Sequence, residues 1–541
     1  MFKSIPKRPN IEFDRKQAKA LFESLKAAEP EALRRFTEHH PAGIPANPKL
    51  TDAQLVIARE YGFPSWPAWK AFVETRGLDR KKQAEIALRA VCSNDIARAR
   101  VLLKADQELA REDFHLACAC GEIEAVNTFL NHDPSLATKP GGINAWEPIQ
   151  YACFSRWLRC DPERTAGIIA VVRRLLDLGA NPNAFHMITW MEEPWKETVL
   201  FAASGIANNP ELTRMLLAAG ADVNEGLSEP DPNDPKKSPW GTEVLYHTSE
   251  FRDTTCLKLI LDARPYAHCV SYCMARALDF ENPEAVTLFL AHGADPNLRF
   301  KGHENRTHLH RAVKAGRSAA IITALLVAGA DASAKDDLGL TPYQYAVRYG
   351  FEDIQHLLEK SGPKEATAED RALGRIMQGH APKDLAHSIH PDLLCDAARR
   401  NDTRAITRLL DAGADINAPD IGQYGTPPLH WAAWRGQFEA LRLLVGRGAD
   451  IHLTNLYGGA ALGTAIHGSA NCFDVEGGPA MRLPEEALQG AYPQIVEYLI
   501  SAGAKLPDKI HGGSDPVKEI LRRHGVPDET EPDEPAKKST Q

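Results

Sequence analysis

The chain has 541 residues, of which 43% are hydrophobic and 25% charged, and its formal net charge is -9. This acidic balance disfavours broad binding to nucleic acid or to an anionic membrane surface. No stretch approaches the roughly 18 apolar residues of a membrane helix. The opening stretch MFKSIPKRPNIEFDRKQAKA has no apolar core like that of a secretory signal, and the ten cysteines are scattered. We therefore expect a cytoplasmic protein with reduced thiols that contacts neither nucleic acid nor membrane.

Residues 1–80 are predicted to form amphipathic helices. Thr51 and Gln54 fit a capping box for one of these helices, and Ser65 fits the cap of the next. We expect this block to cover the apolar face of the repeats that follow, because terminal units of a repeat array need a polar outer side. A separate partner-binding role for the block stays open.

From residue 84 onward, a short pattern returns at a nearly constant spacing. Its end is an apolar pair followed by glycine, as in LLAAGADVN at 216, FLAHGADPN at 289 and LLDAGADIN at 409. Its beginning is seen in RTHLHRAVKAG at 306, LTPYQYAVRYG at 340 and PPLHWAAWRGQ at 427. Gly413 and Gly448 are 35 residues apart, which leaves room for two short helices in each period. The sequence therefore predicts a stack of helix pairs.

Two positions of the pattern have a specific backbone role. The glycine can take a left-handed conformation at the helix end without a Cβ penalty, and Thr307 and Thr341 can cap the first helix of their units. The whole pattern resembles the ankyrin repeat, which reads G-x-T-P-L-H-x-A-A, then a second helix, then L-L-x-x-G-A-D-x-N. The resemblance extends over roughly residues 84–526. It implies an all-α ankyrin-repeat solenoid of about 11–12 helix-turn-helix units with a helical amino-terminal cap.

The chain is expected to have distinct parts along its length. The amino-terminal block resembles a helical segment found at the front of some bacterial ankyrin-repeat proteins. A polar segment interrupts the period and is predicted to be a helical connector between two stacks, while the charged, proline-rich end is predicted to be disordered. The predicted parts are the helical cap 1–80, repeat array I at 84–362, the connector 363–389, repeat array II at 390–526 and the tail 527–541.

No motif predicts a catalytic centre, a cofactor or a metal site. The chain lacks a glycine-rich nucleotide loop, and the two histidines of HENRTH at 303 are spaced too widely for a zinc-protease helix. His268, Cys269 and Cys273 lack the further ligand that a structural zinc site needs. In ankyrin-repeat proteins the histidine of the pattern bonds backbone groups between repeats, so the resemblance implies a structural role for it. Here it falls on His115, His310 and His430.

Long insertions are the feature that most separates this chain from a plain repeat array. The inserted segment 184–196 carries Trp190 and Trp195, and the inserted segment 225–241 ends near Trp240. Segments 156–167 and 470–490 lie between the two helices of their units. Long loops with aromatic residues favour a functional role, although these side chains could equally form local cores over neighbouring loops.

The residue after the repeat histidine is expected on the first helix of each unit, toward the concave side. This column holds Tyr151, His247, Arg276, Arg311, Tyr345, Asp396 and Trp431. Trp434 and Arg435 follow one turn later. Tyr, Trp and Arg dominate binding hot spots, although a merely solvated face would also show such variety. The predicted partner-binding residues are Tyr151, Trp190, Trp195, Trp240, His247, Arg311, Tyr345, Trp431, Trp434 and Arg435.

Two functions are compatible with this pattern. The favoured hypothesis is a monomeric scaffold that binds a protein or peptide partner in its concave groove, because a stacked array offers a long, preorganised surface. The alternative is an enzyme or small-molecule binder with a pocket built from the loops 184–196 and 225–241. Its polar candidates are His186, Glu192, Glu193, His247 and Glu250. An enzyme requires these groups to converge in one deep pocket, whereas a scaffold does not.

Overall fold

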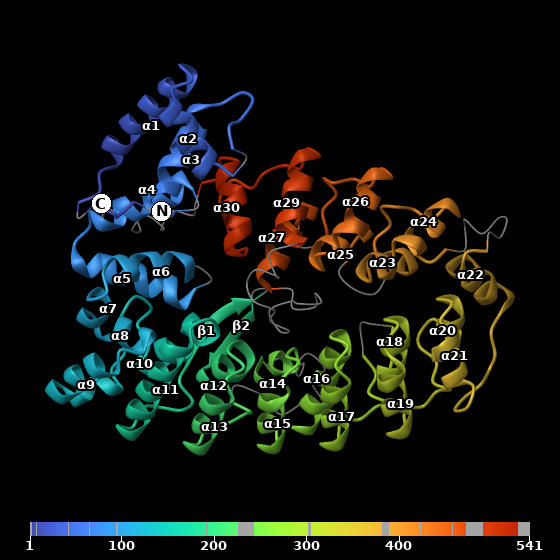
Figure 1. Cartoon of the computed structure of the whole chain (residues 1–541). Helices are drawn as coiled ribbons and strands as arrows, with labels where there is room; N and C mark the ends of the chain where they lie inside the picture. The colour runs from blue at the N-terminus through green and yellow to red at the C-terminus, as the bar shows by residue number, and fades with distance from the viewer. Residues whose placement is uncertain are drawn as a thin grey trace, which may run out of the picture. The chain divides into compact units, whose positions relative to one another are not determined.

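The computed structural model divides the chain into two compact units (Figure 1). Unit 1 comprises Met1–Ala184 and Lys518–Gln541, and unit 2 comprises Phe185–Val517. The structure describes residues 3–6, 8–41, 43–63, 65–93, 96–190, 193–225, 243–300, 304–380, 389–420, 425–456, 458–471 and 491–527. The helix α30 (Asp515–Arg523) spans the boundary between the two units.

Unit 1 begins with a helical block that has its own aliphatic core. Its helices are α1 (Ile11–Lys26), α2 (Pro30–His39), α3 (Leu50–Glu60) and α4 (Trp66–Arg76). Leu21, Phe36 and Val56 are buried in this core. Trp69 on α4 is fully buried, and its indole nitrogen donates a hydrogen bond to the carboxylate of Asp14 at 3.0 Å. This bond satisfies a buried donor and holds α4 to α1.

The remainder of unit 1 consists of helix pairs and short helical turns. They are α5 (Arg80–Cys92), α6 (Ile96–Ala105), α7 (Leu109–Glu112), α8 (Phe114–Cys120), α9 (Ile123–His132), η1 (Pro134–Ala137), α10 (Pro148–Cys153), η2 (Arg156–Arg159) and α11 (Pro162–Asp177). α5 packs on α8, and α8 packs on α10. A Cβ atom added to Gly167 would lie 2.2 Å from the carbonyl oxygen of Gly121, so these backbones meet closely because both residues are glycine.

Unit 2 opens with a β-hairpin and continues as pairs of short helices. Its elements are β1 (Phe185–Trp190), β2 (Glu193–Thr198), α12 (Val199–Phe201), the π-turn η3 (Ala202–Ile206), α13 (Pro210–Ala218), α14 (Glu243–Thr248), α15 (Thr255–Asp262), α16 (Ala267–Asp279), α17 (Pro283–Ala291), α18 (His308–Lys314), α19 (Ala319–Val327), α20 (Pro342–Arg348), α21 (Glu352–Leu358), α22 (Ala368–Gln378), α23 (Pro391–Arg399), α24 (Thr403–Asp411), α25 (Pro428–Trp434), α26 (Phe438–Gly446), α27 (Ala461–Asn471) and α29 (Ala491–Ser501).

The helices of unit 2 form two parallel rows (Figure 1). The first helices of the pairs pack in the order α14, α16, α18 and α20, and then α23, α25 and α27. The second helices pack in the order α13, α15, α17, α19 and α21, and then α24, α26 and α29. The helix α22 packs on both α20 and α24. The fold is therefore a solenoid in which each pair buries its apolar face against the next.

The local signals of the repeat pattern are confirmed. Glycines of the repeat pattern that follow a second helix have a left-handed backbone, with φ of 95° at Gly413 and 91° at Gly448. The hydroxyl of Thr341 accepts a hydrogen bond from the backbone nitrogen of Gln344 at 3.3 Å, and Thr307 caps α18 in the same way. These side chains satisfy donors that the first turn of a helix leaves without a partner.

One local prediction in the amino-terminal block is wrong. The cap of α3 is not Thr51 with Gln54, because the helix already begins at Leu50. The Asp52 carboxylate instead accepts a hydrogen bond from the backbone nitrogen of Lys49 at 2.6 Å. The prediction for Ser65 is confirmed, since its hydroxyl accepts from the backbone nitrogen of Ala68 at 3.2 Å.

The inserted segment 184–196 contributes an antiparallel hairpin to an otherwise helical chain. β1 pairs with β2 in a register that places Ile188 opposite Trp195 and Trp190 opposite Glu193. On β1, Phe185 and Met187 are 39% and 51% exposed. Across the strands, His186 lies 3.1 Å from the Glu197 carboxylate.

Two further observations concern the described part of the chain. None of its helices is long and apolar enough to cross a membrane. The cysteines that it includes form no disulfide, and burial raises the pKa of thiols such as Cys92 and Cys153. A raised thiol pKa disfavours the reactive thiolate, so these cysteines act as small apolar core residues.

Candidate binding surface

The first helices of unit 2 present a row of charged side chains that begins at α14. The Nδ1 atom of His247 lies 3.0 Å from a carboxylate oxygen of Glu250, and Nε of Arg276 on α16 donates to the same oxygen at 2.8 Å. The Glu250 side chain is only 1% exposed, whereas those of His247 and Arg276 are 28% and 15% exposed. Burial raises the pKa of Glu250, but the neighbouring His247 and Arg276 lower it by a larger amount, so the net shift of the pKa is downward. One buried carboxylate thus orients the partly exposed side chains of His247 and Arg276.

The row continues through Asp279 at the end of α16. Its carboxylate lies 3.6 Å from Arg276 and 3.4 Å from Arg311 on α18. Arg311 is 20% exposed, and its guanidinium also lies 5.0 Å from the ring centre of Phe300. Burial raises the pKa of Asp279, but Arg311, Arg276 and then Arg435 lower it, and the net shift is again downward. Arg435, which directly follows α25, therefore also contributes to the electrostatic environment of the Asp279 carboxylate.

A buried charge cluster connects α18 with α23. The ammonium group of Lys314 lies 2.6 Å from Asp396 and 3.0 Å from Asp392. The hydroxyl of Tyr349 donates to the same Asp396 oxygen at 2.6 Å. Both aspartate side chains are 4% exposed, so the cluster is closed to solvent on the carboxylate side. Charges in such a place need a partner, since an unpaired buried carboxylate is strongly destabilising.

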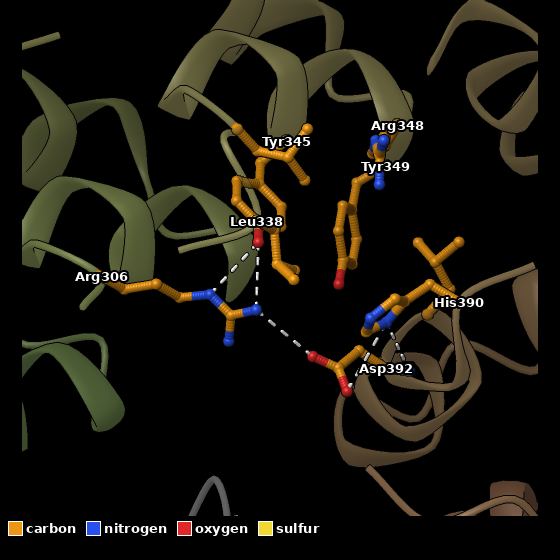
Figure 2. A pocket seen from close by; sticks show the side chains of 9 residues that line it. Arg306, Leu338, Tyr345, Arg348, Tyr349, His390 and Asp392 are labelled. Carbon is orange, nitrogen blue, oxygen red and sulfur yellow. Dashed lines mark hydrogen bonds and ion pairs between the residues drawn. The ribbon is translucent and has the colours of Figure 1, made fainter. Parts of the chain in front are cut away.

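Arg306 extends this cluster toward α20, as Figure 2 shows. Its guanidinium donates to the hydroxyl of Tyr345 at 3.0 Å and lies 3.6 Å from Asp392. The Tyr345 hydroxyl in turn donates to Asp336 at 2.6 Å. The cavity between these side chains has a volume of about 10 Å³. That is room for about one water molecule, so the cluster holds the repeats together rather than enclosing a ligand.

At α25 the surface becomes aromatic. The indole nitrogen of Trp431 donates to Asp420 at 3.1 Å, and the guanidinium of Arg399 lies 3.7 Å from the ring centre of Trp431. Burial raises the pKa of Asp420 to about 6. Trp434, one turn later, is only half-buried and stacks on His467 with ring centres 5.4 Å apart.

The structure separates the predicted partner-binding residues into two described groups. Four of them are buried, namely Tyr151, Tyr345, Trp431 and Arg435, and their contact with a partner stays a prediction. Three are partly exposed, namely His247, Arg311 and Trp434. Tyr151 shows why burial occurs, because its hydroxyl donates to the carbonyl of Gly141 at 2.9 Å inside unit 1. The polar groups of Tyr151, Tyr345 and Trp431 each have a hydrogen-bond partner within the protein.

The side chains of the three tryptophans in the inserted loops lie outside the described residues. Trp240 lies outside the described residues, as does Glu192. The backbones of Trp190, Glu193 and Trp195 belong to the β-hairpin, but their side chains are outside the described set. His186 and Glu250, the remaining candidates of the enzyme hypothesis, belong to separate ion pairs with Glu197 and with His247.

The repeat histidines are structural at two of the three positions. Nε2 of His310 bonds the carbonyl oxygen of Leu340, and Nε2 of His430 bonds that of Gly459, both at 3.0 Å. Both acceptors lie in the hairpin turn of the next unit. His115 differs, because its Nε2 is buried without a hydrogen-bond partner and its ring packs against Tyr151. Burial lowers the pKa of His115, His310 and His430, so the neutral imidazole is favoured.

No group of His, Cys, Asp and Glu side chains among the described residues could hold a metal ion. The sequence pattern predicts Arg276 and Asp396 on the first helices of their units, where they lie, but does not indicate their partners Asp279 and Lys314. A polar residue at a helix end gives no signal of what it will meet in a unit one or two repeats away. Arg306 had one possible signal, because it directly precedes the capping Thr307 and therefore lies in the turn that faces the next unit.

Comparison with known families agrees with this geometry. A model of ankyrin repeats in three copies matches residues 272–370, and a model of ankyrin repeats in many copies matches residues 394–445. The chain contains ankyrin repeats. The matched residues run from α16 through α26 and so include most of the charged row and the aromatic end of the surface.

Several known proteins are similar to parts of this chain. It is 28% identical over 157 residues to the transient receptor potential cation channel subfamily A member 1 homolog of Caenorhabditis elegans, 27% of this chain and 13% of that protein. It is 26% identical over 223 residues to the E3 ubiquitin-protein ligase KEG of Arabidopsis thaliana, 36% of this chain and 14% of that protein. It is 28% identical over 194 residues to the neurogenic locus notch homolog protein 1 of Danio rerio, 34% of this chain and 7% of that protein. This chain therefore spans less than a fifth of the length of these relatives.

Proposed function

We propose that unit 2 is a protein-interaction module that binds a protein or peptide partner through its first helices α14, α16 and α18, with Trp434 on α25 as an aromatic contact. The observation that supports this proposal most is that Glu250 holds the side chains of both His247 and Arg276. His247 and Arg276 are partly exposed, yet their positions are set by one carboxylate that is 1% exposed. A partner that contacts them therefore meets side chains that have already lost their conformational freedom.

The chemistry of this surface suits protein recognition. Arg276 and Arg311 are held 2.8 Å and 3.4 Å from carboxylates, and their side chains remain 15% and 20% exposed, so that a partner's carboxylate or carbonyl groups can contact them. Arg and Trp are also the side chains most often found at energetic centres of interfaces. The relatives support the proposal by fold-level analogy alone. A monomeric state and a cytoplasmic location stay predictions.

Affinity capture from the native host, followed by native mass spectrometry, tests this proposal. Combining Arg311→Ala with Trp434→Ala is expected to lower the recovery of a co-purifying protein at least about tenfold, as truncation of two contact residues does. Arg214→Ala is the matched control, because Arg214 is an exposed arginine on the second helix α13. Equal recovery with the double variant and with the control would overturn the proposal.

The enzyme or small-molecule hypothesis remains a prediction. Its pocket requires the segment 225–241, most of which lies outside the described residues. Within the described part, His247 and Glu250 are 3.0 Å apart, which is a geometry in which a carboxylate orients an imidazole for acid–base work. The Arg276 guanidinium donates to the same carboxylate, so these contacts also hold Arg276 in place on the proposed binding surface.

A further inference from the structure

A second surface lies on the opposite row of helices, between α24 and α26. An open groove of about 460 Å³ runs between these two second helices. Its volume lies within the range of common ligand sites, which is about 300–1,000 Å³. The side chains that define its character are Arg404, Thr407, Arg408, Glu439, Arg442 and Leu443.

The groove carries more positive than negative charge. It is lined by the arginines Arg404, Arg408 and Arg442 and by a carboxylate, that of Glu439. Arg442 and Glu439 form an ion pair at 2.8 Å, with exposed fractions of 59% and 54%. Such exposed pairs contribute little stability, so a competing carboxylate can replace Glu439 at small cost.

The other two arginines differ in how they are held. Arg408 is half-buried and donates to the carbonyl oxygen of Met377 near the end of α22, which fixes its position at one end of the groove. Arg404 is exposed, and among the residues that the structure describes it has no carboxylate partner. A guanidinium of this kind has five donor hydrogens in a planar arrangement that matches a carboxylate.

The floor and walls of the groove are rigid. Ile406 and Leu409 of α24 and Ala440 and Leu444 of α26 are fully buried, so the two helices that form the walls are anchored in the core of unit 2. Leu443 is half-buried and offers an apolar contact between the arginines. The groove therefore combines positive charge, carried by two well-anchored helices, with one aliphatic patch.

We propose that this groove binds an acidic peptide segment of a protein partner. Carboxylates of the segment contact Arg404 and Arg442, and an aliphatic side chain of the segment lies on Leu443. Clusters of arginine that recognise acidic motifs operate by this chemistry. The site is separate from the first-helix surface of the proposed function and does not depend on it.

Fluorescence anisotropy with the full chain tests this site. The probe is a fluorescein-labelled peptide of sequence Asp-Glu-Asp-Leu-Glu-Asp-Glu, and the reference peptide has lysine at each acidic position. The acidic peptide is expected to bind, more weakly as salt rises from about 50 to 300 mM, because exposed charges are screened. The lysine peptide is expected not to bind.

The variants give the decisive comparison. Arg404→Gln combined with Arg442→Gln is expected to raise the dissociation constant at least about tenfold, by removing two charge-assisted contacts. Arg214→Gln is the control, because Arg214 is also an exposed arginine on a second helix, α13. This substitution is expected to change the dissociation constant less than about twofold. Thermal melts establish that each variant is folded.

Three results would overturn the proposal. The wild-type chain could fail to bind the acidic peptide at about 50 mM salt, or the double variant could bind it as tightly as the wild type. A single-stranded DNA oligonucleotide of equal charge could also bind as tightly as the peptide and lose affinity in the same variant. That outcome would assign the groove to anions in general rather than to an acidic protein segment.

Discussion

The ammonium nitrogen of Lys314 lies 2.6 Å from a carboxylate oxygen of Asp396, although the two residues are 82 positions apart in the sequence. Lys314 ends α18 and Asp396 lies on α23, so the contact joins helices on either side of the connector 363–389. Tyr349 donates to the same oxygen. We propose that the two predicted repeat arrays behave as one folded body because these buried groups satisfy one another.

Breaking this contact is expected to destabilise unit 2 strongly. Lys314→Ala leaves Asp392 and Asp396 buried beside one another without their ammonium partner, and the expected loss is about 3–5 kcal/mol of unfolding free energy. Urea unfolding followed by circular dichroism measures this loss. Arg447→Ala is the control, because its ion pair with Asp411 is exposed and is expected to contribute less than about 1 kcal/mol. Losses of equal size in the two variants would contradict the role given to Lys314.

His308 is expected to make the protein sensitive to acid. Burial lowers its pKa to about 3, and its Nε2 bonds the carbonyl oxygen of Ser271 at 2.9 Å. A base with a depressed folded pKa stabilises the fold fully above its unfolded pKa of about 6.5, and this stability is lost as the pH falls below that value. His308→Gln keeps a donor but cannot take up the proton. Its melting temperature should therefore fall less than that of the wild type between about pH 7 and pH 5, with His452→Gln as the exposed control.

Asp420 is expected to have the opposite dependence on pH. Burial raises its pKa to about 6, and a carboxyl with a raised folded pKa binds more protons in the folded state. The wild type therefore loses stability as the pH rises from about 4 to 6. Asp420→Asn removes the titrating group, and its single amide oxygen can keep one of the two bonds that the Asp420 carboxylate accepts, from the Trp431 indole and from the Thr426 backbone nitrogen. The melting temperature of the variant minus that of the wild type should therefore rise from about pH 4 to pH 6. If this difference stayed constant over the interval, the raised pKa assigned to Asp420 would be contradicted.

Substituting alanine for each of two glycines in helices is expected to change the stability of the fold in opposite directions. A Cβ atom on Gly374 of α22 would lie 2.2 Å from the carbonyl oxygen of Val347 on α20, whereas one on Gly446 of α26 would meet no atom within 4 Å. Gly374→Ala should therefore cost about 2 kcal/mol or more through a clash that neither backbone can relieve. Gly446→Ala should stabilise by a few tenths of a kcal/mol up to about 1 kcal/mol through helix propensity. Thermal melts of both variants decide the comparison.

The sequence predicted the features that depend on neighbouring residues. The left-handed glycines, the caps at Thr307 and Thr341, and the roles of His310 and His430 all follow from the repeat unit itself. The β-hairpin was missed, although alternating apolar residues in FHMITW are compatible with a strand. Contacts between distant units were not predictable in this way. The partner of Lys314 lies 82 residues away, and the approach of Gly374 to Val347 depends on how α22 packs on α20, which no single unit encodes.

Site-specific photo-crosslinking in the native host tests the proposed binding surface most directly. A benzophenone amino acid is introduced in turn at position 311, at position 434 and at position 214 on the second helix α13. We expect the same partner to be captured from positions 311 and 434 and not from position 214. Capture of that partner from position 214 alone, or no capture from positions 311 and 434, would contradict it.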